Sequence, residues 1–181
     1  LSRLNIDRRR QAKILANLGY NWYTLGDIER ARDYLDKAEK LARELEHTRT
    51  ILNSLQQSAR AVARSDPKHA LQLAEQSLQY LPVEPRPGGR SAAQAEVAFF
   101  AIKTGDLDKA RRAAQSAVEA ADKGAANAQL DLVRAKLGET PPTEFERIAA
   151  DEKADSEMRL EAMLELALRA RADGPPARIV A

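Results

Sequence analysis

The sequence has no cysteine, few aromatic residues and no long apolar run. Without cysteine, a disulfide framework and thiol chemistry are excluded. Since no run of about 18 apolar residues occurs, no membrane-spanning helix is expected. Aromatic residues make up only 4% of the chain, and alanine supplies much of the 44% that is hydrophobic. Because alanine is the best helix former and lets helices approach closely, this composition favours packed helices over a β-sandwich.

The polar residues form no recognisable catalytic constellation. The net charge is +2, and the basic residues make no dense stripe of the kind expected in a nucleic-acid reader. His47 and His69 have no second histidine or cysteine at metal-ligand spacing, and we interpret the basic triplet Arg8–Arg10 as an exposed helix end. A nucleophile elbow and a phosphate-binding loop are absent from the sequence. We therefore predict a protein that is not an enzyme and has no metal or cofactor.

Helix-breaking residues recur along the chain at intervals of 33 to 40 residues. The breaks are Gly26-Asp27, Ser65-Asp66, Gly105-Asp106, Gly138-Glu139 and Gly174-Pro175. At such a break, glycine can take a positive φ and end one helix, and aspartate can cap the next helix. The pairs Ser91/Gln94 and Thr143/Glu146 have the spacing of capping boxes, which predicts two further helix starts.

Between the breaks, apolar residues follow helical spacing. The first stripe consists of Leu15, Leu18, Trp22 and Leu25. This periodicity predicts an all-α fold of about nine helices in one array over residues 1–181. The expected repeats are 8–47, 48–82, 91–123, 125–154 and an incomplete 155–181, with a proline- and glycine-rich loop at 83–90.

The segment Ala12–Ala42 resembles a tetratricopeptide repeat (TPR). The residues that match the family pattern, in order, are Leu18-Gly19, Trp22, Gly26-Asp27, Ala31, Leu35 and Ala38. The match is strong over residues 12–45, weaker in the next two units, and rests on helix pattern alone after about residue 138. The resemblance implies antiparallel helix hairpins stacked into a right-handed superhelix, in which neighbours bury each other's apolar faces.

Repeat steps near 40 residues exceed the family's usual length of about 34. They are similar to the long repeats of kinesin-light-chain-like arrays, which many bacterial signalling proteins carry beside other domains. Because the sequence begins at Leu1 without a methionine, we expect a piece of a larger protein, and the resemblance suggests a bacterial multidomain protein. We expect a cytoplasmic location.

The resemblance also implies a ligand-binding groove. In TPRs the ligand-facing residues lie on the first helix of each hairpin. Transferred by their offset from each turn, these positions are Lys13, Asn17, Tyr20, Tyr23, Thr24, Gln56, Glu96, Phe99, Lys103, Gln129 and Lys136. Trp22 is expected to lie between the two helices of its hairpin. For Phe99, packing inside the core stays open as an alternative.

The function that the resemblance implies is a non-catalytic scaffold that binds a peptide or a partner domain in the concave groove. The alternative is a regulatory array that controls a kinase, caspase-like protease or ATPase domain elsewhere in the same polypeptide. A remote third hypothesis is nucleic-acid binding through the basic N-terminal end. The expected partner is thus a protein, a peptide or another domain of the same chain, rather than a membrane; self-association is left open.

Overall fold

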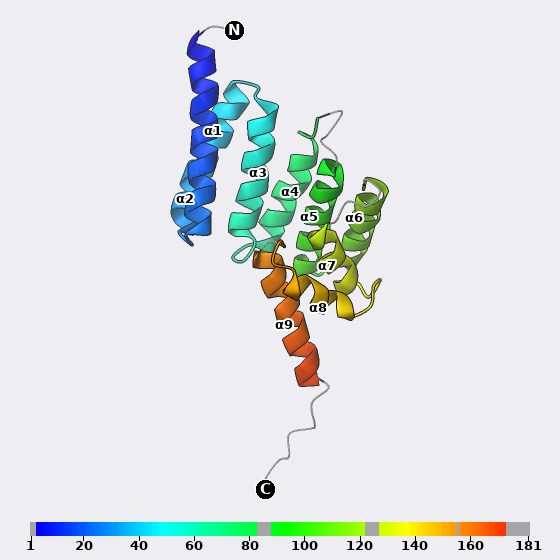
Figure 1. Ribbon diagram of the computed structural model, residues 1–181. Helices are drawn as coiled ribbons and strands as arrows, with labels where there is room; N and C mark the ends of the chain where they lie inside the picture. Colours follow the sequence, from blue (N-terminus) through cyan, green and yellow to red (C-terminus); the bar gives the residue numbers. More distant parts are fainter. Residues whose placement is uncertain (1–2, 83–87, 122–126, 155, 173–181) are drawn as a thin grey trace. The chain divides into compact units, whose positions relative to one another are not determined.

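The computed structural model describes residues 3–82, 88–121, 127–154 and 156–172. Nine α-helices lie in these ranges, and no strand is found there (Figure 1). The helices are α1 (Arg3–Thr24), α2 (Ile28–Glu44), α3 (Thr48–Val62), α4 (Pro67–Leu78), α5 (Gly89–Thr104), α6 (Leu107–Glu119), α7 (Ala128–Lys136), α8 (Thr143–Ala150) and α9 (Ser156–Ala172). The predicted all-α class is confirmed. The Gly174-Pro175 break and most of the 83–90 loop lie outside the described residues.

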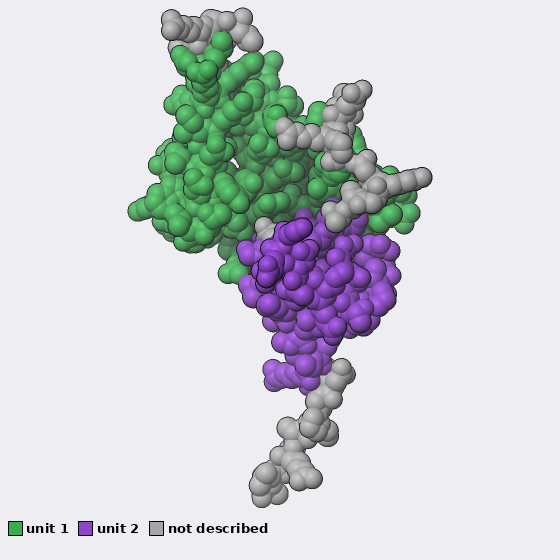
Figure 2. Space-filling model, viewed as in Figure 1, with its two compact units in different colours: residues 1–125 green, residues 126–181 purple. Residues whose placement is uncertain are grey.

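The chain forms two compact units, residues 1–125 (unit 1) and residues 126–181 (unit 2) (Figure 2). Unit 1 contains α1 to α6, and unit 2 contains α7 to α9. Within unit 1 each helix packs against the next one, and α1 also packs against α3; within unit 2 all three helices pack together. The continuous superhelix over residues 1–181 and the repeat boundaries stay predictions.

The predicted glycine-aspartate turns are present in unit 1. Gly26 and Gly105 have φ angles of 82° and 80°, in the left-handed region that glycine adopts without strain. The carboxylates of Asp27 and Asp106 then each accept the backbone N–H three residues later at 3.0 Å. Asp66 caps α4 in the same way. These aspartates therefore fix where α2, α4 and α6 begin.

The capping boxes predicted around Ser91 and Thr143 are wrong. α5 begins at Gly89, with Gly88 as its N-cap, so Ser91 lies inside the helix and is buried. α8 begins at Thr143 itself, with Pro142 before it and no side-chain cap. In both places glycine or proline shapes the preceding backbone, and the hydroxyl is not in the position of a cap.

Helices α1 and α2 approach each other closely at Gly19. A Cβ atom added to Gly19 would lie 2.6 Å from Leu35 Cγ, too close for the two to coexist without a shift. Leu35 is fully buried, as are the small residues Ala31 and Ala38 on the same face of α2. The absence of a side chain at position 19 thus makes room for Leu35 between the two helices.

The apolar stripe predicted on α1 is not its buried face. Ala12, Ala16 and Gly19 are buried, whereas Trp22 is half-buried and Leu25 is 74% exposed. Both series have helical spacing, so periodicity alone does not separate them. Small residues lie on the inner side because they permit close contact with neighbouring helices, and the larger side chains border that contact.

Unit 2 is held by a small set of large apolar side chains. Leu132 of α7 is fully buried, as are Phe145 and Ile148 of α8, and α9 contributes the buried Ala162. The guanidinium of Arg169 on α9 lies 4.8 Å from the centroid of the Phe145 ring. None of the described helices of either unit has the length and apolar character that crossing a membrane requires.

Candidate binding surface

Four of the predicted groove residues share an exposed face of α1. Lys13, Asn17, Tyr20 and Thr24 are spaced by four, three and four residues, which places them in one row along the helix, and all four are exposed. The Thr24 hydroxyl donates a hydrogen bond to the backbone oxygen of Asn21 at 2.8 Å. Lys13 and Tyr20 are about 10 Å apart along the axis, at a rise of about 1.5 Å per residue.

Trp22 and Tyr23 do not occupy the positions that the sequence predicted, with Trp22 between the two helices and Tyr23 in the groove. Tyr23 continues the buried series of Ala16 and Gly19 and is half-buried. Trp22 is half-buried too, and the Arg30 guanidinium lies 4.5 Å from the centroid of its ring. The position between the two helices of the hairpin, expected for Trp22, belongs to Gly19 with Leu35. Tyr20 is therefore the aromatic residue that α1 presents to solvent.

Two predicted groove residues of α5 are buried. Glu96 and Phe99 are each only 2% exposed, so they are corrected from surface to core positions. The Glu96 carboxylate accepts a hydrogen bond from Arg60 Nε of α3 at 2.8 Å. Lys103, which is half-buried, covers Phe99 with its ammonium 4.7 Å from the ring centroid. The alternative of core packing for Phe99 is thus the correct one.

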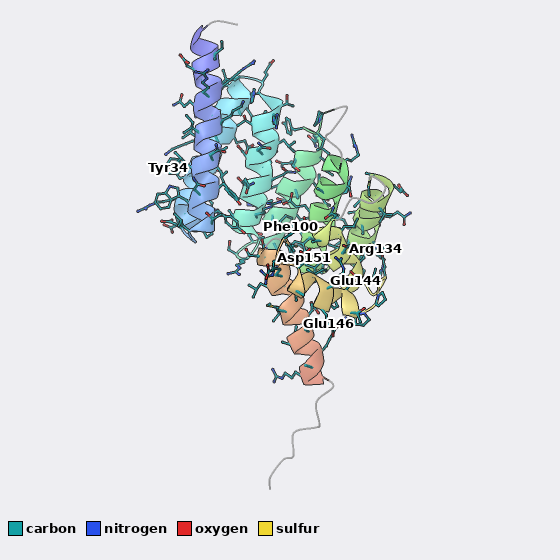
Figure 3. All side chains as sticks on the ribbon, in the orientation of Figure 1. Tyr34, Phe100, Arg134, Glu144, Glu146 and Asp151 are labelled. Atoms are coloured by element: carbon teal, nitrogen blue, oxygen red, sulfur yellow. The ribbon has the colours of Figure 1, made fainter. Side chains whose placement is uncertain are left out.

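Phe100, which follows Phe99 on α5 and is labelled in Figure 3, is only 1% exposed. Its ring centroid is 5.7 Å from that of Phe99, with the two planes tilted by 60°. Such a tilted pair packs as a unit in a protein core. α5 consequently contributes core side chains where the sequence suggested ligand contacts.

The remaining predicted residues do not join the α1 face. Gln56 on α3 is half-buried, and Gln129 on α7 of unit 2 is half-buried as well. Lys136 lies between two carboxylates of α9, with Nζ at 2.9 Å from Glu161 and at 3.0 Å from Glu165. Burial acts to lower the pKa of Lys136, but the hydrogen bonds to Glu161 and Glu165 and the negative charges of both together raise it. Lys136 is committed to the interior of unit 2.

A basic cluster at the start of α3 was not predicted from the sequence. Burial lowers the pKa of His47, and the positive charges of Lys13, Arg9 and Arg49 lower it further. The His47 ring nitrogen Nδ1 lies 2.6 Å from the Thr50 hydroxyl. Because α1 packs against α3, the charges of three cations act on one imidazole. The sequence signal was the i, i+4 spacing of Arg9 and Lys13, which puts them on one helix face.

The basic cluster adjoins the exposed row of α1, because Lys13 belongs to both. The neighbouring Arg8 is not part of the cluster: its guanidinium pairs with Glu44 of α2 at 2.7 Å. The surface formed by Arg9, Lys13, Asn17, Tyr20, His47 and Arg49 is called the α1–α3 surface below. It joins positive charge at one end to an exposed phenol at the other, with an amide between them.

Comparison with known proteins adds no identification. A scan against models of protein families finds no match, and a search of curated proteins finds none either. Over the part of the chain that the structure describes, no three histidine, aspartate or glutamate side chains gather in a way that would hold a metal ion. The α1–α3 surface is accordingly interpreted from its own residues.

Proposed function

We propose that this chain is a TPR-like scaffold and that its α1–α3 surface binds an acidic, extended segment of a protein partner. The proposal rests mainly on Arg9, Lys13 and Arg49, whose positive charges act on His47 where α1 packs against α3. Like charges held together disfavour one another, and a carboxylate brought among them would be attracted by all three. The pKa of His47 is lowered first by burial, and these three positive charges lower it further.

The exposed row of α1 supplies the rest of the recognition. Tyr20 offers an apolar ring with a polar tip, a side-chain type that is enriched where proteins bind each other. Asn17 stands between Tyr20 and Lys13 and can both donate and accept hydrogen bonds. A peptide strand rises by about 3.3 Å per residue. The spacing of Lys13 and Tyr20 therefore suits a ligand with an acidic residue about three positions from an apolar anchor.

Selection from a random peptide display library tests this proposal and requires no named partner. The selected peptides should share an acidic residue about three positions from an aromatic or apolar one. Titration calorimetry of one such peptide should show binding that weakens as salt is raised, because screening reduces attraction between exposed charges. The variants Lys13→Glu and Tyr20→Ala should each weaken the binding at least several-fold.

The matched control is Lys40→Glu, which reverses the charge of an exposed lysine on α2, a helix that contributes no residue to the α1–α3 surface. Binding by this variant should equal that of the unchanged chain. Selected peptides without acidic residues, or equal weakening by Lys40→Glu, would overturn the proposal. Tighter binding of a random single-stranded RNA than of any selected peptide, lost again in Lys13→Glu, would reassign the surface to nucleic acid.

A further inference from the structure

Helix α9 is apolar on two faces. One face packs within unit 2, where Met158 and Ala162 are buried and Arg159 Nε donates to the backbone oxygen of Ala149 at 3.3 Å. The other face exposes Leu160, Met163, Leu164 and Leu168, at 54, 48, 52 and 53%. Of the ten large apolar side chains exposed in the described ranges, these four share one helix. A contiguous row of this kind marks an interaction surface, whereas single exposed apolar residues are ordinary.

The exposed row of α9 is complementary to itself. In an antiparallel pair of α9 helices centred on Leu164, Leu164 meets its own copy and Leu160 meets Leu168. The same register places Glu157 opposite Arg171, so that each end of the pair joins opposite charges. Leu164 is the middle residue of Ser156–Ala172, and the overlap therefore uses the whole helix.

The like charges in this register do not face the partner. Arg159 would stand opposite Arg169, but each of them is turned toward its own unit: Arg159 to Ala149, and Arg169 to the ring of Phe145. Glu161 and Glu165, on the packed side as well, are held by Lys136. A parallel pair would instead set Glu157 against Glu157 and Arg171 against Arg171. Charge thus selects the antiparallel arrangement.

We infer that two copies of this chain associate through antiparallel pairing of their α9 helices about Leu164. The same patch serves both copies, as in a two-fold symmetric dimer. A single helix pair buries less surface than a standard protein interface, so the dimer forms reversibly and depends on concentration. Pairing would make the scaffold bivalent, with one α1–α3 surface on each copy.

Sedimentation velocity over a concentration series tests the association in the full chain. The unchanged chain should shift from monomer toward dimer as its concentration rises. Leu164→Glu sets two carboxylates against each other at the centre and should weaken the dimer by about tenfold or more. Leu25→Glu, at a leucine that directly follows α1 and is 74% exposed, should dimerise normally. A chain that stays monomeric throughout, or equal loss in Leu25→Glu, would overturn the inference.

Cysteine cross-linking tests the register, because the chain has no cysteine of its own. Under mild oxidation, Leu164→Cys should form a covalent dimer much faster than Leu25→Cys. A mixture of Leu160→Cys and Leu168→Cys chains should cross-link to each other faster than either chain does to itself. If Leu160→Cys alone and Leu168→Cys alone each form covalent dimers as fast as the mixture does, the pairing is parallel and the antiparallel arrangement is contradicted.

Discussion

Units 1 and 2 are both all-helical, but their helices are held together differently. In unit 1, small residues allow close approach, as where Leu35 packs into the space beside Gly19, and aspartate caps define the starts of three helices. In unit 2, α7 and α8 have only nine and eight residues. Phe145 and the pairing of Lys136 with two glutamates hold these short helices to α9.

The difference shows where each unit is vulnerable. A close helix contact made of many small residues distributes its stabilisation, so that no single residue accounts for most of it. Short helices contribute little stability by themselves and depend on tertiary packing. In unit 2 that packing passes through few side chains. Single substitutions should therefore have larger effects in unit 2 than in unit 1.

The largest effect is expected for Phe145→Ala in the core of unit 2. Removing a fully buried phenylalanine costs about 3–5 kcal/mol, which is comparable to the whole stability of so small a unit. Unit 2 should unfold while unit 1 stays folded. The only tryptophan, Trp22, lies in unit 1. The melting temperature reported by its fluorescence should therefore equal that of the unchanged chain, while circular dichroism shows a loss of helix.

Leu35→Ala is the counterpart of that variant in unit 1. It should lower the Trp22 transition and leave the hydrogen exchange of α7, α8 and α9 unchanged. If Phe145→Ala lowers the Trp22 transition as much as Leu35→Ala does, the two units do not unfold separately and the comparison fails.

The next effect is expected for Lys136→Met, which leaves Glu161 and Glu165 side by side without their cation. We expect a loss of about 2–3 kcal/mol in the free energy of unfolding of unit 2. This is less than the loss for a fully buried pair, because both glutamates keep some contact with water. Urea unfolding followed by hydrogen exchange in α7 and α9 measures it, and an unchanged midpoint would show that the ion pairs do not stabilise the unit.

The same lysine makes unit 2 sensitive to alkali. Burial acts to lower the pKa of Lys136, but the hydrogen bonds and negative charges of Glu161 and Glu165 together raise it above its ordinary value of 10.5 in the folded chain. Its stabilisation is therefore complete below pH 10.5 and is lost as the pH rises through the folded pKa. Unfolding midpoints of unit 2 should fall over this alkaline range in the unchanged chain, and less in Lys136→Met. An equal fall of the midpoint with pH in the two proteins would contradict the role assigned to Lys136.

Gly19→Ala should have a moderate effect on unit 1. Its new Cβ would lie 2.6 Å from Leu35 Cγ, so Leu35 or the helices must move. Overpacking of this kind costs about 1–2 kcal/mol even though alanine is the better helix former. The Trp22 transition should fall accordingly. In Asn21→Ala, at an exposed position of the same helix, it should not fall, and a stabilised Gly19→Ala would show that α1 and α2 are less closely packed.

The smallest effects are expected for two substitutions at helix starts, one in a helix with a side-chain cap and one in a helix without it. Asp27→Ala removes the bond to the Arg30 N–H and should cost about 1 kcal/mol. Thr143→Ala removes no cap bond from α8 and should change stability by less than about 0.5 kcal/mol. Thermal unfolding followed separately for each unit measures both, and equal losses would mean that Thr143 caps α8 after all.

Local chemistry made much of the fold predictable from the sequence. The Gly26-Asp27 and Gly105-Asp106 turns need only the conformational freedom of glycine and the reach of an aspartate over three residues. The inner face of α1 was not predictable in that way. It depends on how closely α2 approaches, and the large residues of α1 border the contact while Ala16 and Gly19 fill it.

The candidate surface was predicted only in part, because partners far along the chain decide exposure. Glu96 is buried with Arg60 of α3, and Lys136 is held by Glu161 and Glu165 of α9. The position of a residue within its own helix hairpin gives no information about such partners on other helices. The exposed row with Lys13 and Tyr20 was predictable since it depends on the spacing of one helix, whereas the cluster around His47 needed the packing of α3 against α1.

The most direct test of the α1–α3 surface is the pKa of His47, measured by NMR as a selected acidic peptide is added. A carboxylate bound near Arg9, Lys13 and Arg49 would offset their positive charge and favour the protonated ring, so the His47 pKa should rise. His69, the other histidine of the chain, lies on α4 and is not part of the α1–α3 surface. It serves as the reference, because adding the peptide at constant pH should not change its NMR signal. An unchanged His47 pKa at saturating peptide would place the binding elsewhere and contradict the proposal.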